Sequence, residues 1–227
     1  MGNYKYCLII FFLLSFVKPQ AQVNKDSIID LKYLEDQLYL SITYSILNNK
    51  PATISQNGFS GGFSLGFIKD IPLNEQRNIG LGIGIGYAYN VYVQNLKISR
   101  ENQTSLFELA EDYKTNRLGI KAFEFPIEFR WRNSAPQKYS FWRVYGGIKV
   151  SYLIAEKTKF ENSEVLITTK DIPEFNKIQY GIILAAGYST WNLYFYYGLS
   201  PLFKSAVFNE KNLDLKDINI GLKFYIM

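Results

Sequence analysis

One stretch of the chain alternates so strictly that it constrains the fold more than any other feature. Every odd position from 79 to 93 carries a large, mostly apolar side chain: Ile79, Leu81, Ile83, Ile85, Tyr87, Tyr89, Val91 and Val93. The even positions between them are mostly small or polar: Gly80, Gly82, Gly84, Gly86, Ala88, Asn90 and Tyr92. A period of two is that of a β-strand. Glycine is a poor residue for a solvated strand surface, but it suits the crowded interior of a small barrel.

Seven further segments alternate in the same way, so we predict eight strands in all. The predicted ranges are 37–47, 58–68, 79–93, 120–131, 141–154, 177–188, 191–199 and 217–227. Each is long enough to cross a bilayer at a tilt, which needs ~9–11 residues per strand. Links between the later strands alternate between long and short, and the shortest is Ser189-Thr190. Because Leu118 and Ile120 fall out of phase with the fourth strand, we predict a bulge near Lys121-Ala122.

The N-terminus has the pattern of a secretory signal peptide. An apolar core runs from Cys7 to Val17, with Lys5 before it and the polar, small-residue exit Lys18–Ala21 after it. That core is too short to span a membrane as a helix, which needs ~20 residues. We predict a signal peptide at 1–21, a periplasmic lead-in at 22–35 and the barrel at 36–227. Because Cys7 opens the apolar run rather than following it, we do not expect a lipoprotein.

These features predict an all-β fold, an eight-stranded antiparallel transmembrane β-barrel of the outer-membrane type. We expect both termini in the periplasm, the long loops outside the cell and the barrel wall against outer-membrane lipid. The rival interpretation is a soluble β-sandwich or a lipocalin-like barrel. It leaves many large apolar side chains facing water with nothing to cover them, so the sequence favours the membrane barrel.

Composition excludes several kinds of chemistry. The chain has no histidine and one cysteine, which removes Ser-His-Asp and Cys-His mechanisms, histidine-ligated metals and disulfides. The glycine run from 80 to 86 lies inside a strand with no helix after it, so it is not a phosphate loop. A formal net charge of +5 spread along the chain gives no nucleic-acid footprint. We therefore expect no enzyme activity, no cofactor, no metal site and no identifiable small-molecule substrate.

Charged residues on the predicted inward faces are the main candidate site. They are Glu124, Glu128, Arg130, Arg132, Arg143, Lys149 and Lys223. One interpretation is a selectivity lining or a conformational switch. The plainer one is a mutually paired plug, because eight strands leave an interior that side chains just fill. Glu124 and Glu128 could suggest a glycosidase pair, but among so many cations both should stay ionised and serve poorly as general acids.

The fourth and fifth predicted strands form a hairpin about 133–139, and its register decides which charges meet. If paired residue numbers sum to 273, Glu124 lies opposite Lys149. If they sum to 271, Glu128 lies opposite Arg143. Either register leaves the other acid within diagonal reach of a cation, because inward neighbours lie ~4.5–8 Å apart.

Several segments share a pattern with one family of outer-membrane proteins. These segments are Tyr33–Tyr39, Asn57–Gly62, Asp70–Glu75, Arg77–Ile79, Pro126–Arg132, Phe141–Tyr145 and Phe224–Ile226. With them the chain resembles the PorT family of Bacteroidota. The resemblance implies an eight-stranded outer-membrane barrel associated with the type IX secretion system and, in gliding bacteria, with surface motility. It also implies secretion-apparatus proteins as partners, and it carries over no enzymatic residues.

Some alternatives stay open at this point. The protein is either a scaffold subunit of a secretion apparatus or a small barrel that passes hydrophobic molecules or adheres to surfaces. A charge-plugged lumen favours the first, and an apolar tunnel that opens sideways favours the second. In the second long loop, the amphipathic stretch Ser105–Glu111 is either a partner-binding element or a packing turn. Ser27 lies in an O-glycosylation-like triplet that stays open, whereas the N-glycosylation triplet at Asn102 has little meaning in a bacterial outer-membrane protein.

Overall fold

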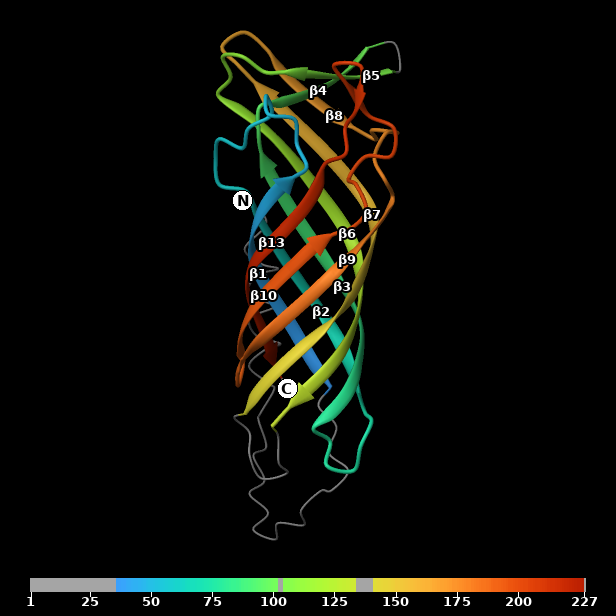
Figure 1. The fold of residues 1–227 in the computed structure, drawn as a ribbon. Coiled ribbons are helices and arrows are strands. Elements are labelled where there is room, and N and C mark those ends of the chain that lie inside the picture. Colours follow the sequence, from blue (N-terminus) through green and yellow to red (C-terminus); the bar gives the residue numbers. More distant parts are fainter. Residues whose placement is uncertain (1–35, 102–103, 134–140, 227) are drawn as a thin grey trace, which may run out of the picture. The chain divides into compact units, whose positions relative to one another are not determined.

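The computed structural model describes residues 36–101, 104–133 and 141–226. Eight strands form a closed antiparallel barrel (Figure 1). They are β1 (Gln37–Asn48), β2 (Gly61–Pro72), β3 (Ile79–Val93), β6 (Thr115–Arg132), β7 (Trp142–Glu161), β9 (Ile178–Tyr188), β10 (Trp191–Gly198) and β13 (Lys216–Ile226). Each pairs with the next, and β13 pairs with β1 to close the sheet. The predicted eight-stranded barrel is confirmed.

Several predictions fall on segments for which the structure gives no placement. The signal peptide at 1–21, the lead-in at 22–35 with Ser27, Asn102 and most of the turn at 133–139 lie outside the described residues. Within the described ranges, no helix has the length and apolar character needed to span a membrane.

The glycine face of β3 makes room for two large side chains from other strands. Gly86 lies opposite Gly66 of β2, and a Cβ on either glycine would collide with Tyr39 of β1. A Cβ on Gly82 would likewise collide with the guanidinium of Arg130. The glycines therefore face inward because Tyr39 and Arg130 fill the space where their side chains would lie.

The predicted bulge is present, but it lies in the partner strand. The register between β6 and β7 shifts at Lys121/Ala122, where Lys121 pairs with Ala155 and Ala122 pairs with Leu153. Ile154 of β7 therefore has no pairing partner on β6 and is the bulged residue. On β6 the even positions stay buried along the whole strand, so the expected phase change in that strand is wrong. It was expected because apolar residues at 118 and 120 were taken to face outward.

An apolar core, the loop-end cluster, fills the barrel at the end where the long connections lie. It comprises Leu47, Ile54, Tyr92, Leu96, Ile98, Leu118, Ile120, Leu153, Ile172, Phe175, Leu202, Phe203, Ala206, Phe208, Leu213 and Leu215. Leu118 and Ile120 face inward because they join this core.

Five short strands accompany the long connections. They are β4 (Leu96–Glu101), β5 (Thr104–Leu109), β8 (Leu166–Lys170), β11 (Val207–Phe208) and β12 (Lys211–Asn212). β4 and β5 form a hairpin, and β8 extends the sheet beside β7. Phe107 of β5 packs edge-on against Phe203, with ring centroids 5.4 Å apart. Most of the amphipathic stretch is therefore a strand, and it packs onto the loop-end cluster.

Candidate functional site

All seven charged residues predicted for the lumen face the barrel interior and are buried. They are Glu124, Glu128, Arg130, Arg132, Arg143, Lys149 and Lys223, none more than 8% exposed. They come from β6, β7 and β13, and their contacts divide them into a network around Glu128, a pair at Glu124 and a separate Arg143.

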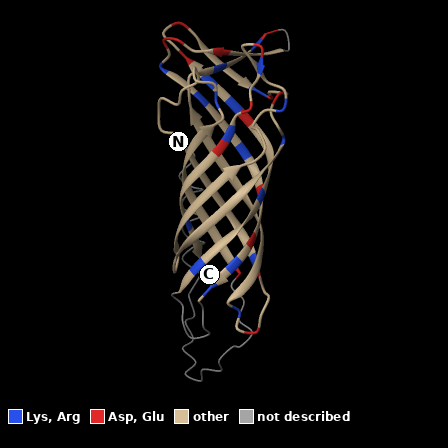
Figure 2. Cartoon of the chain, viewed as in Figure 1, with Lys and Arg blue, Asp and Glu red and all other residues tan. Residues whose placement is uncertain are grey.

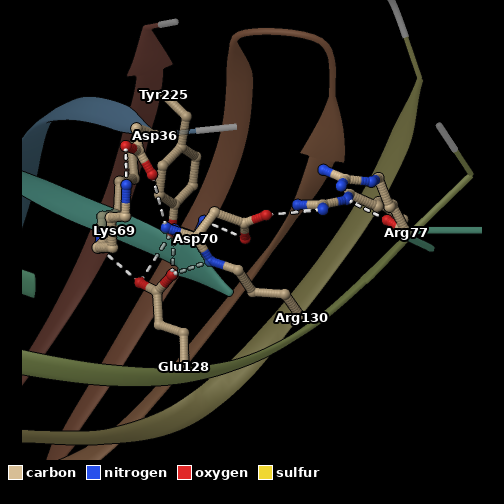
Figure 3. A network of polar contacts seen from close by, with 9 residues as sticks. Asp36, Lys69, Asp70, Arg77, Glu128, Arg130 and Tyr225 are labelled. Carbon is tan, nitrogen blue, oxygen red and sulfur yellow. Dashed lines mark hydrogen bonds and ion pairs between the residues drawn. The ribbon is translucent and has the colours of Figure 1, made fainter. Parts of the chain in front are cut away.

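Glu128 is the centre of the larger network (Figure 3). One carboxylate oxygen, Oε1, accepts hydrogen bonds from Lys223 Nζ and from the Tyr225 hydroxyl, each at 3.0 Å. The other, Oε2, accepts from Nε of Arg130 at 3.1 Å and from its Nη2 at 3.0 Å. Each oxygen thus has two donors, which is the arrangement that makes a buried carboxylate tolerable.

Asp70 of β2 extends the network toward the short turns. Its Oδ1 lies 3.0 Å from Arg130 Nη1, and its Oδ2 lies 2.7 Å from Arg132 Nη2. Arg130 therefore bridges two carboxylates, and Arg132 also donates from Nε to the backbone oxygen of Arg77 at 2.7 Å. Asp70 was not among the predicted residues, because the second strand was ended at 68. Its even number continues the inward parity of β2, and that signal would have found it.

Asp36 lies beside this network, just before β1 (Figure 3). Lys69 Nζ donates to its carboxylate at 2.6 Å, and the backbone N–H of Asp70 donates to its other oxygen at 3.1 Å. The hydrogen bond from Lys69 is the main reason that the pKa of Asp36 lies below its usual value. Asp36 is thus an ionised anchor between the start of β1 and β2.

Glu124 forms a second ion pair further along β6. Its Oε2 lies 3.0 Å from Lys149 Nζ, and its Oε1 accepts a hydrogen bond from the Tyr39 hydroxyl at 2.7 Å. Lys149 Nζ also lies 4.1 Å from the centroid of the Tyr196 ring, within the range of a cation–π contact. The pair thus has aromatic as well as ionic partners.

The hairpin register differs from both predicted registers. Paired numbers sum to 275, which places Glu124 opposite Ser151, Glu128 opposite Gly147 and Arg132 opposite Arg143. Glu128 therefore does not face Arg143, and Glu124 reaches Lys149 on the diagonal. Pairing begins where Asn133 N–H donates to Trp142 oxygen, so the turn is centred further along the chain than predicted. Alternation determines which residues face inward, whereas the turn determines their partners.

Arg143 is buried without a carboxylate among the described residues. Its guanidinium carbon lies 4.6 Å from the ring centroid of Phe141, 5.9 Å from that of Tyr145 and 5.8 Å from that of Tyr225. Its Nε and Nη1 are buried and make no hydrogen bond. Aromatic faces attract cations, so these rings are what hold its charge inside the barrel. Sequence reasoning missed this aromatic component of the site.

The interior around the Glu124–Lys149 pair is filled. Ser41, Thr43, Asn90 and Asn219 are among the residues around a cavity of about 10 Å³ beside this pair. That volume is near the lower limit of what holds one water molecule, ~10–15 Å³. With the loop-end cluster beyond it, the described interior is filled, and six of the seven predicted charges lie in ion pairs.

The outer wall of the barrel is apolar. β6 presents Phe123, Phe125, Ile127, Phe129 and Trp131 outward, all at least 40% exposed. At the short turns, Trp142 packs on Tyr188 with centroids 5.5 Å apart, and Trp191 packs on Phe224 at 4.8 Å. An apolar band with an aromatic girdle is the pattern of a barrel embedded in lipid.

A closed, even-stranded barrel with an apolar wall and a polar interior defines the class of outer-membrane barrels. In agreement, a family model described as outer membrane protein beta-barrel domain matches residues 20–204, and the chain belongs to this family. The match ends before β13, the strand that closes the barrel against β1. Comparison with curated proteins gave no match.

Proposed function

We propose that this protein is a non-enzymatic outer-membrane subunit that supports type IX secretion, and gliding motility where it is present, through protein contacts. The filled lumen is the observation that carries the first part of this proposal. A barrel whose interior is occupied by paired charges and an apolar core serves as a membrane anchor, and its loops and turns are then the surfaces left for partners.

The assignment to type IX secretion rests on the resemblance to PorT. Four of the resembling segments, far apart in sequence, meet in or beside the Glu128 network: Asp70–Glu75, Pro126–Arg132, Phe141–Tyr145 and Phe224–Ile226. The segments that resemble PorT in sequence therefore contribute to one structural feature of this chain. This convergence supports the view that the resemblance reflects a shared barrel interior rather than a general barrel composition.

The proposed orientation places the short turns and the strand ends near the termini in the periplasm. β1 begins and β13 ends side by side, with Leu38 opposite Ile226. The loop-end cluster lies at the other end of both strands, where Leu47 and Leu215 belong to it. Long loops outside and short turns inside is the usual arrangement of such barrels. Secretion-apparatus proteins would then meet the periplasmic turns or the outer loops.

The absence of enzyme activity is part of the same proposal. Both buried glutamates lie in ion pairs, Glu124 with Lys149 and Glu128 with Lys223 and Arg130. Ionised carboxylates held by cations are poor general acids. The alternative function, passage of hydrophobic molecules, needs an apolar tunnel, and at the level of Glu124 and Glu128 the interior is instead polar and filled.

A deletion strain tests this proposal. We expect secreted cargo to accumulate in the periplasm and, in a gliding host, surface motility to fail. Expression of the wild-type chain should restore both. Normal cargo export and normal motility in the deletion strain would overturn the type IX assignment. Restoration by an empty vector would show that the defect lies elsewhere.

A further inference from the structure

A group of cations, here called the basic hollow, lies on the outward face of β6, β7 and β8. Its charged residues are Arg117, Lys121, Lys157, Lys159, Lys170 and a single acid, Glu156. They surround a hollow of about 440 Å³ that Tyr89, Val91, Gly119 and Ala155 also line. The five cations are separate from the lumen, because they lie on the opposite face of the same strands.

Strand register brings these cations together with fewer acids than cations. Lys157 lies opposite Lys170, and Arg117 lies opposite Lys159. Like charges directly opposite each other on a sheet are destabilising. Among the described residues, only Lys159 of these five has an ion pair, with Glu161 at 2.6 Å. The Glu156 carboxylate is directed elsewhere and accepts a hydrogen bond from the backbone N–H of Ile172 at 2.6 Å.

The basic hollow begins where the apolar wall ends. On β6, Phe123 is the last aromatic outward residue and Lys121 is the next outward position toward the long loops. Lys121 Nζ lies 6.0 Å from the centroid of the Tyr89 ring. Tyrosines at this level mark the boundary between hydrocarbon and headgroups. Figure 2 shows charged segments recurring on the strands at the long-loop end, whereas the middle of the barrel is largely uncharged.

We propose that the basic hollow binds the phosphate groups of a phosphorylated glycolipid in the outer leaflet. This inference rests on the proposed orientation, which places the long-loop end outside. A lipid phosphate supplies the negative charge that four of the five cations lack, and the wall position lets the acyl chains run down along Phe123 and Tyr89. Lysine and arginine bind phosphate oxygens by charge-assisted hydrogen bonds.

The test is a binding titration of the full mature chain in detergent micelles with bisphosphorylated lipid A, followed by native mass spectrometry. The variant is Lys157→Gln with Lys170→Gln. The matched control is Lys204→Gln with Lys211→Gln, which removes two exposed lysines outside the barrel strands. We expect the dissociation constant to rise about tenfold or more in the hollow variant, and less than about twofold in the control. Equal affinity of wild type and hollow variant would overturn the inference.

Two further arms identify the ligand. Lipid A without its phosphates should bind more weakly, and its binding should be insensitive to the hollow variant. Inorganic phosphate alone should not saturate the hollow at concentrations where lipid A does. Stronger binding of phosphatidylglycerol micelles or of inorganic phosphate would overturn the assignment to a phosphorylated glycolipid. Heat-dependent migration on gels verifies that each variant is folded.

A separate labelling experiment distinguishes a failure of this inference from a failure of the proposed orientation. Glu164 is exposed and lies between β7 and β8. A Glu164→Cys variant in intact cells should react with a membrane-impermeant maleimide, whereas the parent chain should not. Labelling without lipid A binding would overturn the inference of a lipid site and leave the proposed orientation standing. No labelling before cell lysis, with labelling after it, would overturn the orientation and this inference together.

Discussion

Lys223 of β13 and Glu128 of β6 meet across the full width of the barrel, with Nζ and Oε1 3.0 Å apart. Three strands separate β6 from β13 in either direction around the closed sheet. The pair therefore joins opposite walls directly, and the backbone ladder alone makes no such connection. Breaking it should affect the barrel as a whole rather than one hairpin.

Glu128→Ala should therefore be strongly destabilising. It leaves Lys223 and Arg130 without their shared carboxylate, and breaking a fully buried pair costs ~3–5 kcal/mol. We expect the free energy of unfolding in urea to fall by an amount of that order. The lipid-facing control Ile127→Leu should change it by less than ~1.5 kcal/mol. Equal unfolding midpoints for the two variants would contradict the network.

Two arginine substitutions of the same size should have unequal effects. Arg130 bridges Glu128 and Asp70, so Arg130→Met should cost about 3 kcal/mol or more. Arg143 contacts aromatic rings and no carboxylate among the described residues, so Arg143→Met should cost less than about 2 kcal/mol. Urea unfolding of both variants compares them. A larger loss for Arg143→Met would show that its charge has a partner not accounted for.

Two glycines, Gly86 of β3 and Gly146 of β7, give a second matched pair of substitutions. A Cβ at Gly86 would collide with the Tyr39 hydroxyl, which holds Glu124, so Gly86→Ala should cost ~1–3 kcal/mol by overpacking. A Cβ at Gly146 would lie 3.7 Å from Leu184 Cδ1, an ordinary contact. Gly146→Ala should therefore be nearly neutral. Similar unfolding midpoints for both variants would mean that Tyr39 moves aside at little cost.

The pair of Asp36 with Lys69 should contribute a small, pH-dependent stability. The pKa of Asp36 is lowered in the folded state, so its contribution is present above the ordinary value of 3.8 and is lost as the pH falls through the folded value. Because the pair is largely exposed, Asp36→Asn should cost less than ~1 kcal/mol at pH 7. Wild type and variant should converge in stability as the pH falls well below the folded pKa of Asp36. A difference that persists there would contradict this titration.

Alternation alone was enough to predict the number of barrel strands and the inward direction of the seven charged residues predicted for the lumen. It could not determine pairing across the barrel, because Lys223 and Glu128 are 95 residues apart and nothing in either segment specifies the other. Nor could it determine the register between β6 and β7, which depends on where the turn is centred. A shift of two residues on each strand was enough to replace the expected facing of Glu128 and Arg143.

Residues at or near the ends of the predicted strands were the other source of error. Asp70 was left outside the second predicted strand although its parity continues that of Ile68, and both side chains are buried. Ile120 has the apolar side chain expected of a lipid-facing residue. It faces inward because the barrel interior becomes apolar near the long loops. A period-two pattern identifies the two faces of a strand. It does not say which of them is polar at each level of the barrel.

The central claim is that the lumen is closed, and single-channel recording of the full mature chain in a planar bilayer tests it most directly. Glu124, Glu128 and their partners fill the interior beside a cavity of about 10 Å³, so we predict no steady open conductance for the wild type. The Glu128→Ala variant should show at most brief openings. A wide, stable conductance in the wild type would contradict the filled lumen and the proposed role as a membrane anchor.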